Sequence, residues 1–272
     1  MIVSQESFAQ TYFTAPGIET GVSEKLAVYR KQTLSFIKYD LKLSIPAKKE
    51  APIAASELIT LSLSKNQAPL QLDFKERRDH LKSISANGRT VPITFLKEHV
   101  IVDSKFLKTG VNNINISFTA GDLSLNRNDD FLYTLLVPDR ARSVFPCFDQ
   151  PDLKATFTLS LTVPTAWQAV GNGPLVDSSI NSGNKTLHFA SSDTISTYLF
   201  SFVAGKFTVV RKNVSGRTMN FFHRETDAAK INYSIDSIFR LHDDAIRFLE
   251  DYTQIPFPFK KLDFIAIPDF QY

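Results

Sequence analysis

The chain has 272 residues, of which 43% are hydrophobic and 22% are charged. This is the composition of a globular protein with one large or two ordinary domains. The 31 basic and 28 acidic residues leave a net charge of +3 and are scattered, so the sequence shows no nucleic-acid-binding footprint. No apolar run approaches the length of a membrane span, and the first residues lack the basic start and apolar run of a signal peptide.

From about residue 34 the sequence alternates apolar and polar residues, the period that places successive side chains on opposite faces of a strand. The clearest runs are residues 39–45 and 157–163. Weaker strand signals cover residues 59–63, 70–74, 114–118 and 197–210. Many short strands separated by turn sequences predict a mainly β fold, either an antiparallel sandwich or a curved sheet assembly of about 200 residues.

Beyond the strands the hydrophobic period changes to three and four residues. This pattern predicts an amphipathic helix over residues 227–252, with Thr226 as its N-cap, and Pro256 and Pro258 end it. A short apolar strand is expected at residues 262–267.

The change of period also predicts the division of the chain. A domain boundary is expected within residues 210–228, which gives a lead-in segment at 1–23, a β domain at 24–215 and the start of a second domain at 216–272. One helix and one strand cannot close a core, so the second domain is expected to be truncated.

Histidines and common catalytic motifs give no complete active site. No two of the five histidines have the spacing of a helical zinc site. His242 falls on the apolar side of the helix and is expected to be a half-buried structural residue. The sequence contains neither a G-x-S-x-G nucleophile elbow nor a G-x-x-x-x-G-K phosphate loop.

The one cysteine and the paired carboxylates also favour structural roles. Because Cys147 is the one cysteine in the sequence, neither an intrachain disulfide nor a thiolate zinc cluster can form. No histidine lies near it in sequence to lower its pKa, and flanking phenylalanines indicate burial. The pair Asp129-Asp130 is expected in a polar loop, and Asp243-Asp244 on the solvent side of the helix. On its own residues, the chain is predicted to be a scaffold.

Residues 141–157 read A-R-S-V-F-P-C-F-D-Q-P-D-L-K-A-T-F. This stretch resembles the A-R-x-x-F-P-C-F-D-E-P-x-x-K-A-x-F segment of the aminopeptidase N family of zinc aminopeptidases, with Gln150 in place of the commoner glutamate. Residues 265–272 resemble the segment directly before that family's G-x-M-E-N motif, and the sequence stops where the motif is expected to begin. The resemblance covers about residues 24–272.

The resemblance implies a saddle-shaped antiparallel β-sandwich that packs on a thermolysin-like (gluzincin) catalytic domain. In the family, H-E-x-x-H and a later glutamate bind zinc, and the glutamate of G-x-M-E-N holds the free amine of a peptide substrate. All of these groups are expected after Tyr272. The chain is therefore expected to hold no zinc and to be inactive alone, acting as scaffold and cleft wall beside its own C-terminal catalytic domain.

Two residues are candidates for substrate contact under this resemblance, Tyr272 directly before the motif and Gln150 in the loop. Asp149 and Gln150 are more simply interpreted as a rigid turn that braces the sandwich against the zinc domain, with Arg142 pairing with Asp149. Family members carry T-Q-F-E-P where residues 134–138 here read T-L-L-V-P. Binding of the substrate amine is therefore not assigned to these residues. Their apolar side chains are expected to form either a hydrophobic pocket wall or part of the core.

An alternative from another functional class is a β-sandwich module that binds protein or carbohydrate and has no peptidase partner. A related alternative is a protein that keeps the aminopeptidase fold but has lost the zinc ligands and acts as a protein–protein scaffold. The sequence that follows Tyr272 distinguishes these readings. We expect an envelope or secreted location rather than a cytoplasmic one, although a single cysteine is compatible with both.

Overall fold

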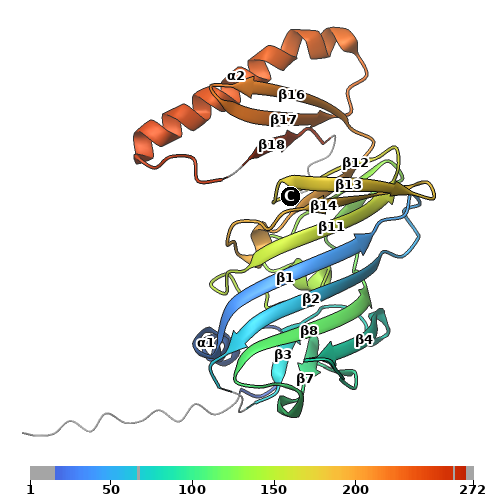
Figure 1. Ribbon diagram of the computed structural model, residues 1–272, viewed down its shortest axis with the longest axis vertical. Coiled ribbons are helices and arrows are strands. Elements are labelled where there is room, and N and C mark those ends of the chain that lie inside the picture. The colour runs from blue at the N-terminus through green and yellow to red at the C-terminus, as the bar shows by residue number, and fades with distance from the viewer. Residues whose placement is uncertain (1–15, 66–67, 260, 268–272) are drawn as a thin grey trace, which may run out of the picture.

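The structure is a computed structural model that describes residues 16–65, 68–259 and 261–267. Its largest element is an eight-stranded sheet that runs diagonally through the molecule (Figure 1). In spatial order its strands are β13 (Leu175–Asn181), β14 (Asn184–Phe189), β11 (Thr156–Pro164), β1 (Leu34–Ser44), β2 (Ala54–Leu63), β8 (Gly110–Thr119), β4 (Leu81–Ala86) and β5 (Arg89–Thr90). Neighbouring strands are antiparallel except β1 and β11, which are parallel. The predicted mainly β fold is confirmed.

The two clearest alternating runs pair with each other at the centre of this sheet. Tyr39 lies opposite Phe157, and Leu41 lies opposite Leu159, and all four are buried. The polar residues between them point to the other face, where they are half-buried or exposed. Alternation therefore gives this sheet one apolar face, as expected from the pleat of a strand.

Two smaller sheets cover that apolar face and complete a sandwich. One consists of β12 (Gln168–Gly171), β15 (Phe202–Gly205), β10 (Phe131–Thr134) and β9 (Leu125–Arg127), and the other of β3 (Leu70–Asp73), β7 (His99–Val102) and β6 (Thr94–Leu96). Aromatic pairs join the layers: the rings of Phe157 and Phe200 stack 4.7 Å apart, and those of Phe74 and Phe118 meet edge to face at 5.9 Å. One continuous apolar core runs through all three sheets.

A fourth sheet and a long helix form a separate layer at one end of the molecule (Figure 1). The sheet contains β16 (Thr208–Val214), β17 (Arg217–His223) and β18 (Leu262–Ile265), with β17 and β18 parallel. Helix α2 (Ala228–Thr253) packs on it through Phe239 and Ile246. The helix and the terminal strand were both expected from the sequence, although the strand ends two residues earlier than predicted.

The start of α2 differs by one residue from the prediction. Asp227, not Thr226, is the N-cap, because its carboxylate accepts hydrogen bonds from the amides of Ala229 and Lys230 at 2.9 and 3.3 Å. The Thr226 amide instead donates to the Glu225 carboxylate in the preceding turn.

The fourth sheet contacts the sandwich through the four-stranded sheet. Phe131 and Tyr133 of β10 belong to one buried apolar cluster with Phe207 and with Phe222 of β17. Beside this cluster, Asp130 pairs with Arg224 at 2.8 Å. The predicted boundary between residues 215 and 216 falls in the turn that joins β16 to β17. Since these two strands pair with each other, the pairing favours a boundary before Thr208, and the division into domains stays a prediction.

Helix α1 (Glu24–Thr33) was not predicted from the sequence. Ser23 caps it by accepting a hydrogen bond from the Leu26 amide, and the helix buries Leu26 and Arg30, one turn apart. A packed helix usually shows a stripe of apolar residues in the sequence. On the buried face of α1, however, the residue one turn after Leu26 is the charged Arg30. The sequence therefore lacks the periodic signal that indicates a helix.

Two expectations for α2 have different outcomes. His242 stacks on Phe264 with ring centroids 3.9 Å apart, and its Nδ1 lies 2.8 Å from the Ile238 carbonyl oxygen, so the prediction of a satisfied structural histidine is confirmed. The prediction that Asp243 faces solvent is wrong. It is 1% exposed, because it faces the β16–β17 turn, where it accepts a hydrogen bond from Ser215 Oγ at 2.7 Å.

An isolated carboxyl group lies inside the sandwich. Glu57 in β2 is opposite Leu41 and Ile116, is 3% exposed, and neither of its carboxylate oxygens has a hydrogen-bond partner among the described residues. Burial raises the pKa of Glu57 well above its ordinary value of 4.5. Burial therefore favours the neutral form of this group, because an unpaired buried carboxylate is far costlier than a neutral acid.

Replacement of Glu57 should change how stability depends on pH. The folded chain releases this proton at higher pH than the unfolded chain, so the contribution of Glu57 is present below pH 4.5 and is lost as pH rises above it. Glu57→Gln should remove that loss and gain stability relative to wild type by up to about 1.4 kcal/mol per pH unit. Urea denaturation at pH 5 and pH 8 measures this difference, with exposed Glu50→Gln as control. Parallel pH profiles for wild type and Glu57→Gln would contradict it.

Candidate functional site

The loop at residues 142–151 lies inside the molecule and pairs with the end of β3. Phe145, Cys147 and Phe148 are at most 1% exposed. The Asp73 amide donates to the Cys147 carbonyl at 2.7 Å, and the Cys147 amide donates back to the Asp73 carbonyl at 3.0 Å. The Phe148 amide donates to the Tyr39 hydroxyl at 3.0 Å. The main chain of the loop is thus bonded to two different sheets.

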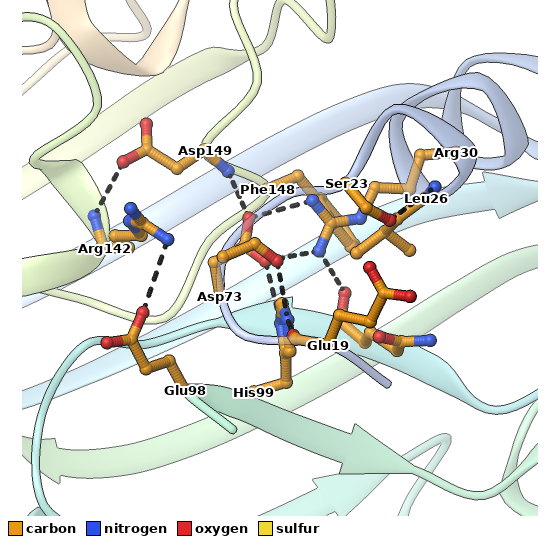
Figure 2. Close-up of polar contacts among 12 residues, drawn as sticks. Glu19, Ser23, Leu26, Arg30, Asp73, Glu98, His99, Arg142, Phe148 and Asp149 are labelled. Carbon is orange, nitrogen blue, oxygen red and sulfur yellow. Dashed lines mark hydrogen bonds and ion pairs between the residues drawn. The ribbon is translucent and has the colours of Figure 1, made fainter. Parts of the chain in front are cut away.

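Asp73 carries a negative charge at the centre of this region (Figure 2). Arg30 from α1 binds its carboxylate with two nitrogen atoms, at 2.8 and 2.5 Å, and the Asp149 amide donates to it at 2.8 Å. Both side chains of the ion pair are at most 2% exposed. Burial alone would raise the pKa of Asp73, but Arg30 and His99 outweigh burial and hold it below its usual range. The two-atom contact is the strong geometry for an arginine–carboxylate pair.

His99, the first residue of β7, completes the cluster and is fully buried. Its Nδ1 lies 2.9 Å from Asp73 Oδ1, and its Nε2 lies 2.8 Å from the Glu19 carbonyl oxygen and 3.0 Å from that of Gly21. Figure 2 shows the imidazole between the Asp73 carboxylate and the segment that precedes α1. Asp73 therefore connects a helix, a loop and two strands.

Asp149 and Arg142 are joined through the main chain. The Arg142 amide donates to Asp149 Oδ2 at 3.1 Å, and the Thr197 hydroxyl donates to Oδ1 at 2.6 Å. The expected side-chain pair is not formed, because the Arg142 guanidinium extends towards Asp139 at 2.7 Å and Glu98 at 3.5 Å. Burial raises the pKa of Asp149. Both oxygens of Asp149 are thus occupied by the chain itself.

Gln150, predicted to contact substrate, faces α1. It is 5% exposed, and its amide nitrogen donates to the Ala27 carbonyl at 3.0 Å and to Asp152 Oδ1 at 2.7 Å. Its position supports the interpretation of the loop as a brace. The brace was expected to hold the sandwich against the zinc domain, whereas the contact that the structure describes is to α1. The role of Gln150 in substrate binding stays a prediction. Tyr272, the other predicted contact, lies outside the described residues.

Cys147 has the environment of a structural residue. It is fully buried, and burial raises the pKa of its thiol well above the ordinary value, with nearby carboxylates adding to the effect. A nucleophilic cysteine needs the opposite shift and access to substrate. The burial expected from its neighbours in sequence is therefore confirmed.

The apolar segment at residues 134–138 is divided between two environments. Leu136 is 2% exposed and belongs to the core, whereas Leu135 is half-buried and Val137 is 48% exposed. The two residues at the polar positions of the family pattern are therefore outside the core. This arrangement leaves them available as part of a wall.

Two clefts lie between the sandwich and the fourth sheet. One has a volume of 370 Å³ and is bounded by β12 and β15 on one side and β18 on the other. The larger has a volume of 1070 Å³ and is bounded by β12 to β14 and by the hairpin of β16 and β17. Both are lined by a mixture of apolar and polar side chains.

No zinc site is formed by the residues described. Within ranges 16–65, 68–259 and 261–267, no three His, Cys, Asp or Glu side chains are grouped so that they could hold a metal ion. Nor does any helix in these ranges have the length and apolar composition needed to cross a membrane.

No sequence pattern indicated that Arg30 and Asp73 belong to a site. His99 was considered only as one of five histidines that are scattered along the sequence. Their sequence separations are 43 and 26 residues, so no local spacing brings them together. The one local signal is Ser23, which is a typical N-cap in front of a charged helix that contains Leu26.

Comparison with known proteins finds one family and several relatives. The family model described as the peptidase M1 N-terminal domain matches residues 36–199. Aminopeptidase M1-C of Oryza sativa subsp. japonica is 35% identical over 131 residues, which are 48% of this chain and 14% of the relative. Aminopeptidase M1 of Arabidopsis thaliana is 34% identical over 140 residues, and endoplasmic reticulum aminopeptidase 1 of Mus musculus is 36% identical over 140 residues. These matches cover 50% and 51% of this chain but only 15% of each relative.

Removal of the central charge should destabilise the fold strongly. Asp73→Asn keeps the shape of the side chain but leaves Arg30 buried without its counter-charge. We expect the free energy of unfolding to fall by about 3–5 kcal/mol, measured by urea denaturation.

The matched control is Asp79→Asn, which breaks a surface pair with Arg77 whose side chains are 66% and 76% exposed. That change should cost about 0–1 kcal/mol. Equal losses for the two variants would show that the buried cluster does not hold the region together.

Proposed function

The chain belongs to the M1 peptidase family through its N-terminal domain, and from this premise we propose that it forms the non-catalytic N-terminal part of a zinc-dependent aminopeptidase. The observation that carries the proposal is the family match over residues 36–199, which covers most of the sandwich. The activity, substrates and partners of the whole protein belong to the proposal, because each relative is matched over only 14–15% of its length.

The contacts of the loop support a scaffold role. A reacting carboxylate needs a free oxygen within reach of substrate. Asp149 instead accepts hydrogen bonds at both oxygens, and Asp73 is sealed between Arg30 and His99. Cys147 is buried with a raised pKa. The chemically most suggestive residues of the sequence are thus used to hold secondary-structure elements together.

The position of the four-stranded sheet supports a second role as a cleft wall. This sheet contacts the fourth sheet through Phe131 and Tyr133, and β12 and β15 line the 370 Å³ cleft opposite β18. In the proposed enzyme, the sandwich closes one side of the space that a peptide enters. Val137, which is 48% exposed beyond β10, lies at an end of the same sheet.

In the proposed enzyme, zinc is bound by the part of the protein outside this chain. When bound in such an enzyme, the metal activates a water molecule for attack on the first peptide bond of the substrate. In the proposed enzyme, the part of this chain is to position the domain that carries the zinc ligands. Peptides with a free N-terminus are the proposed substrates.

The proposal predicts a difference between the isolated chain and the complete gene product. The complete product should bind zinc in a 1:1 ratio and hydrolyse aminoacyl-p-nitroanilide substrates, and a chelator should abolish this activity. The isolated 272-residue chain should do neither, although circular dichroism should show it to be folded. Metal analysis and initial-rate measurements on both proteins test this.

Two results would overturn the proposal. Stoichiometric zinc and turnover in the isolated chain would place the active site within it. A complete gene product that lacks both properties would favour an interaction module over a peptidase.

A further inference from the structure

Strand β13 forms one end of the eight-stranded sheet, where it pairs with β14 on one side (Figure 1). All of its residues, Leu175–Asn181, are exposed. On its other side the strand has no neighbour among the described residues. The N–H and C=O groups of such an edge are available to pair with a further strand, and proteins usually protect a long edge from this pairing.

The turn between β13 and β14 determines which main-chain groups face the open side. Ser182 and Gly183 have φ values of 49° and 79°, which are typical of the tight two-residue hairpin turn. Asn181, directly before the turn, pairs with the first residue of β14. In this hairpin the pair beside the turn exchanges hydrogen bonds, and bonded and non-bonded pairs alternate along the strands. The main-chain groups of Ile180 and Ser178 therefore face away from β14.

The open edge is apolar and carries little charge. Leu175, Val176 and Ile180 are 51%, 65% and 67% exposed. Asp177 is the one charged residue of the strand, and it lies 3.9 Å from His188 of its own hairpin. The strand contains neither lysine nor proline, which are common protections of an edge, whereas the edge strand β16, of equal length, carries an arginine and a lysine.

The pattern of side chains along β13 matches itself in the opposite direction. When two copies of the strand are aligned antiparallel with Ser178 opposite Ser178, Val176 of each copy lies opposite Ile180 of the other. The same register places Asp177 opposite the uncharged Ser179, so the two aspartates do not face each other. Apolar cross-strand pairs stabilise a sheet, and facing like charges destabilise it. A two-fold interface needs a surface that is complementary to itself in this way.

We propose that the open edge of β13 is a homodimer interface, at which two copies of this chain pair antiparallel about Ser178 and join their eight-stranded sheets into one. The main-chain groups of Ser178 bond with those of the same residue in the second copy, and Ile180 packs beside Val176. A single pair of short strands is a small interface, so the association is weak, with a Kd on the order of 10–100 μM. The dimer does not depend on the proposed peptidase activity.

Analytical ultracentrifugation of the 272-residue chain at low salt measures this association. As the concentration rises from about 1 to about 500 μM, the weight-average mass should increase from that of one chain towards that of two. Ser178→Lys places two positive charges face to face on the two-fold axis and should raise Kd by about threefold or more.

The matched control is Ser179→Lys, which adds the same charge at the next exposed residue of the same strand. In the dimer this lysine lies opposite Asp177, so the variant should lower Kd by about twofold or more. An effect of net charge alone would shift Kd in the same direction for both variants. That result would overturn the proposal, as would a wild-type chain that stays monomeric up to about 500 μM.

Disulfide formation tests the register of the pairing. In the dimer, Ser178→Cys places two thiols on the axis, where the Cα atoms of a hydrogen-bonded pair are about 5.5 Å apart, a separation that a disulfide can bridge. The native Cys147 is fully buried and does not compete. Ser182→Cys, in the exposed turn of the same hairpin, is the control, because its two copies would lie about eight residues of strand apart, roughly 27 Å.

Under mild oxidation, Ser178→Cys should form the covalent dimer at least about tenfold faster than Ser182→Cys, because only the first pair of thiols is held within bonding distance. Random collisions between copies would not favour residue 178 over the exposed turn. Equal rates, or faster cross-linking of Ser182→Cys, would therefore overturn the proposal.

Discussion

The buried charge of Asp73 is the constraint on which the rest of this region depends. A carboxylate in a protein core is tolerated only where opposite charges and hydrogen bonds replace water. Here Arg30, His99 and the Asp149 amide provide that replacement, and each comes from a different element. The need to neutralise one charge therefore fixes the positions of α1, β7 and the loop at residues 142–151 relative to β3.

The same constraint gives structural contacts to the loop at residues 142–151, which contains the one cysteine of the sequence, Asp149 and two prolines. Its main chain continues the sheet at Asp73, and its side chains bind neighbouring segments. In the proposed enzyme this domain would serve the chemistry by being rigid, because a cleft wall that moves cannot hold a substrate in a defined position.

The sequence predicted the parts of the structure that are controlled by local periodicity. The strands around Tyr39 and Phe157 follow from alternation, and helix α2 follows from three- and four-residue spacing. The parallel pairing of the two strands was not predicted. It did not predict α1, where Arg30 occupies the buried face, because a charged residue there has no meaning until its partner is known. Asp243 was misplaced for the same reason, since its partner Ser215 comes from a turn 28 residues away.

We propose that the loop at residues 142–151 acts as a brace and takes no part in catalysis. The most direct test is Asp149→Asn in the complete, zinc-loaded gene product, with stability and kcat/KM measured on the same preparation. A brace role predicts a lower free energy of unfolding, by about 1–3 kcal/mol for the weakened buried hydrogen bonds, with kcat/KM per zinc-loaded molecule within about threefold of wild type. Unchanged stability with a loss of kcat/KM of a hundredfold or more would place Asp149 in the catalytic machinery and contradict the account.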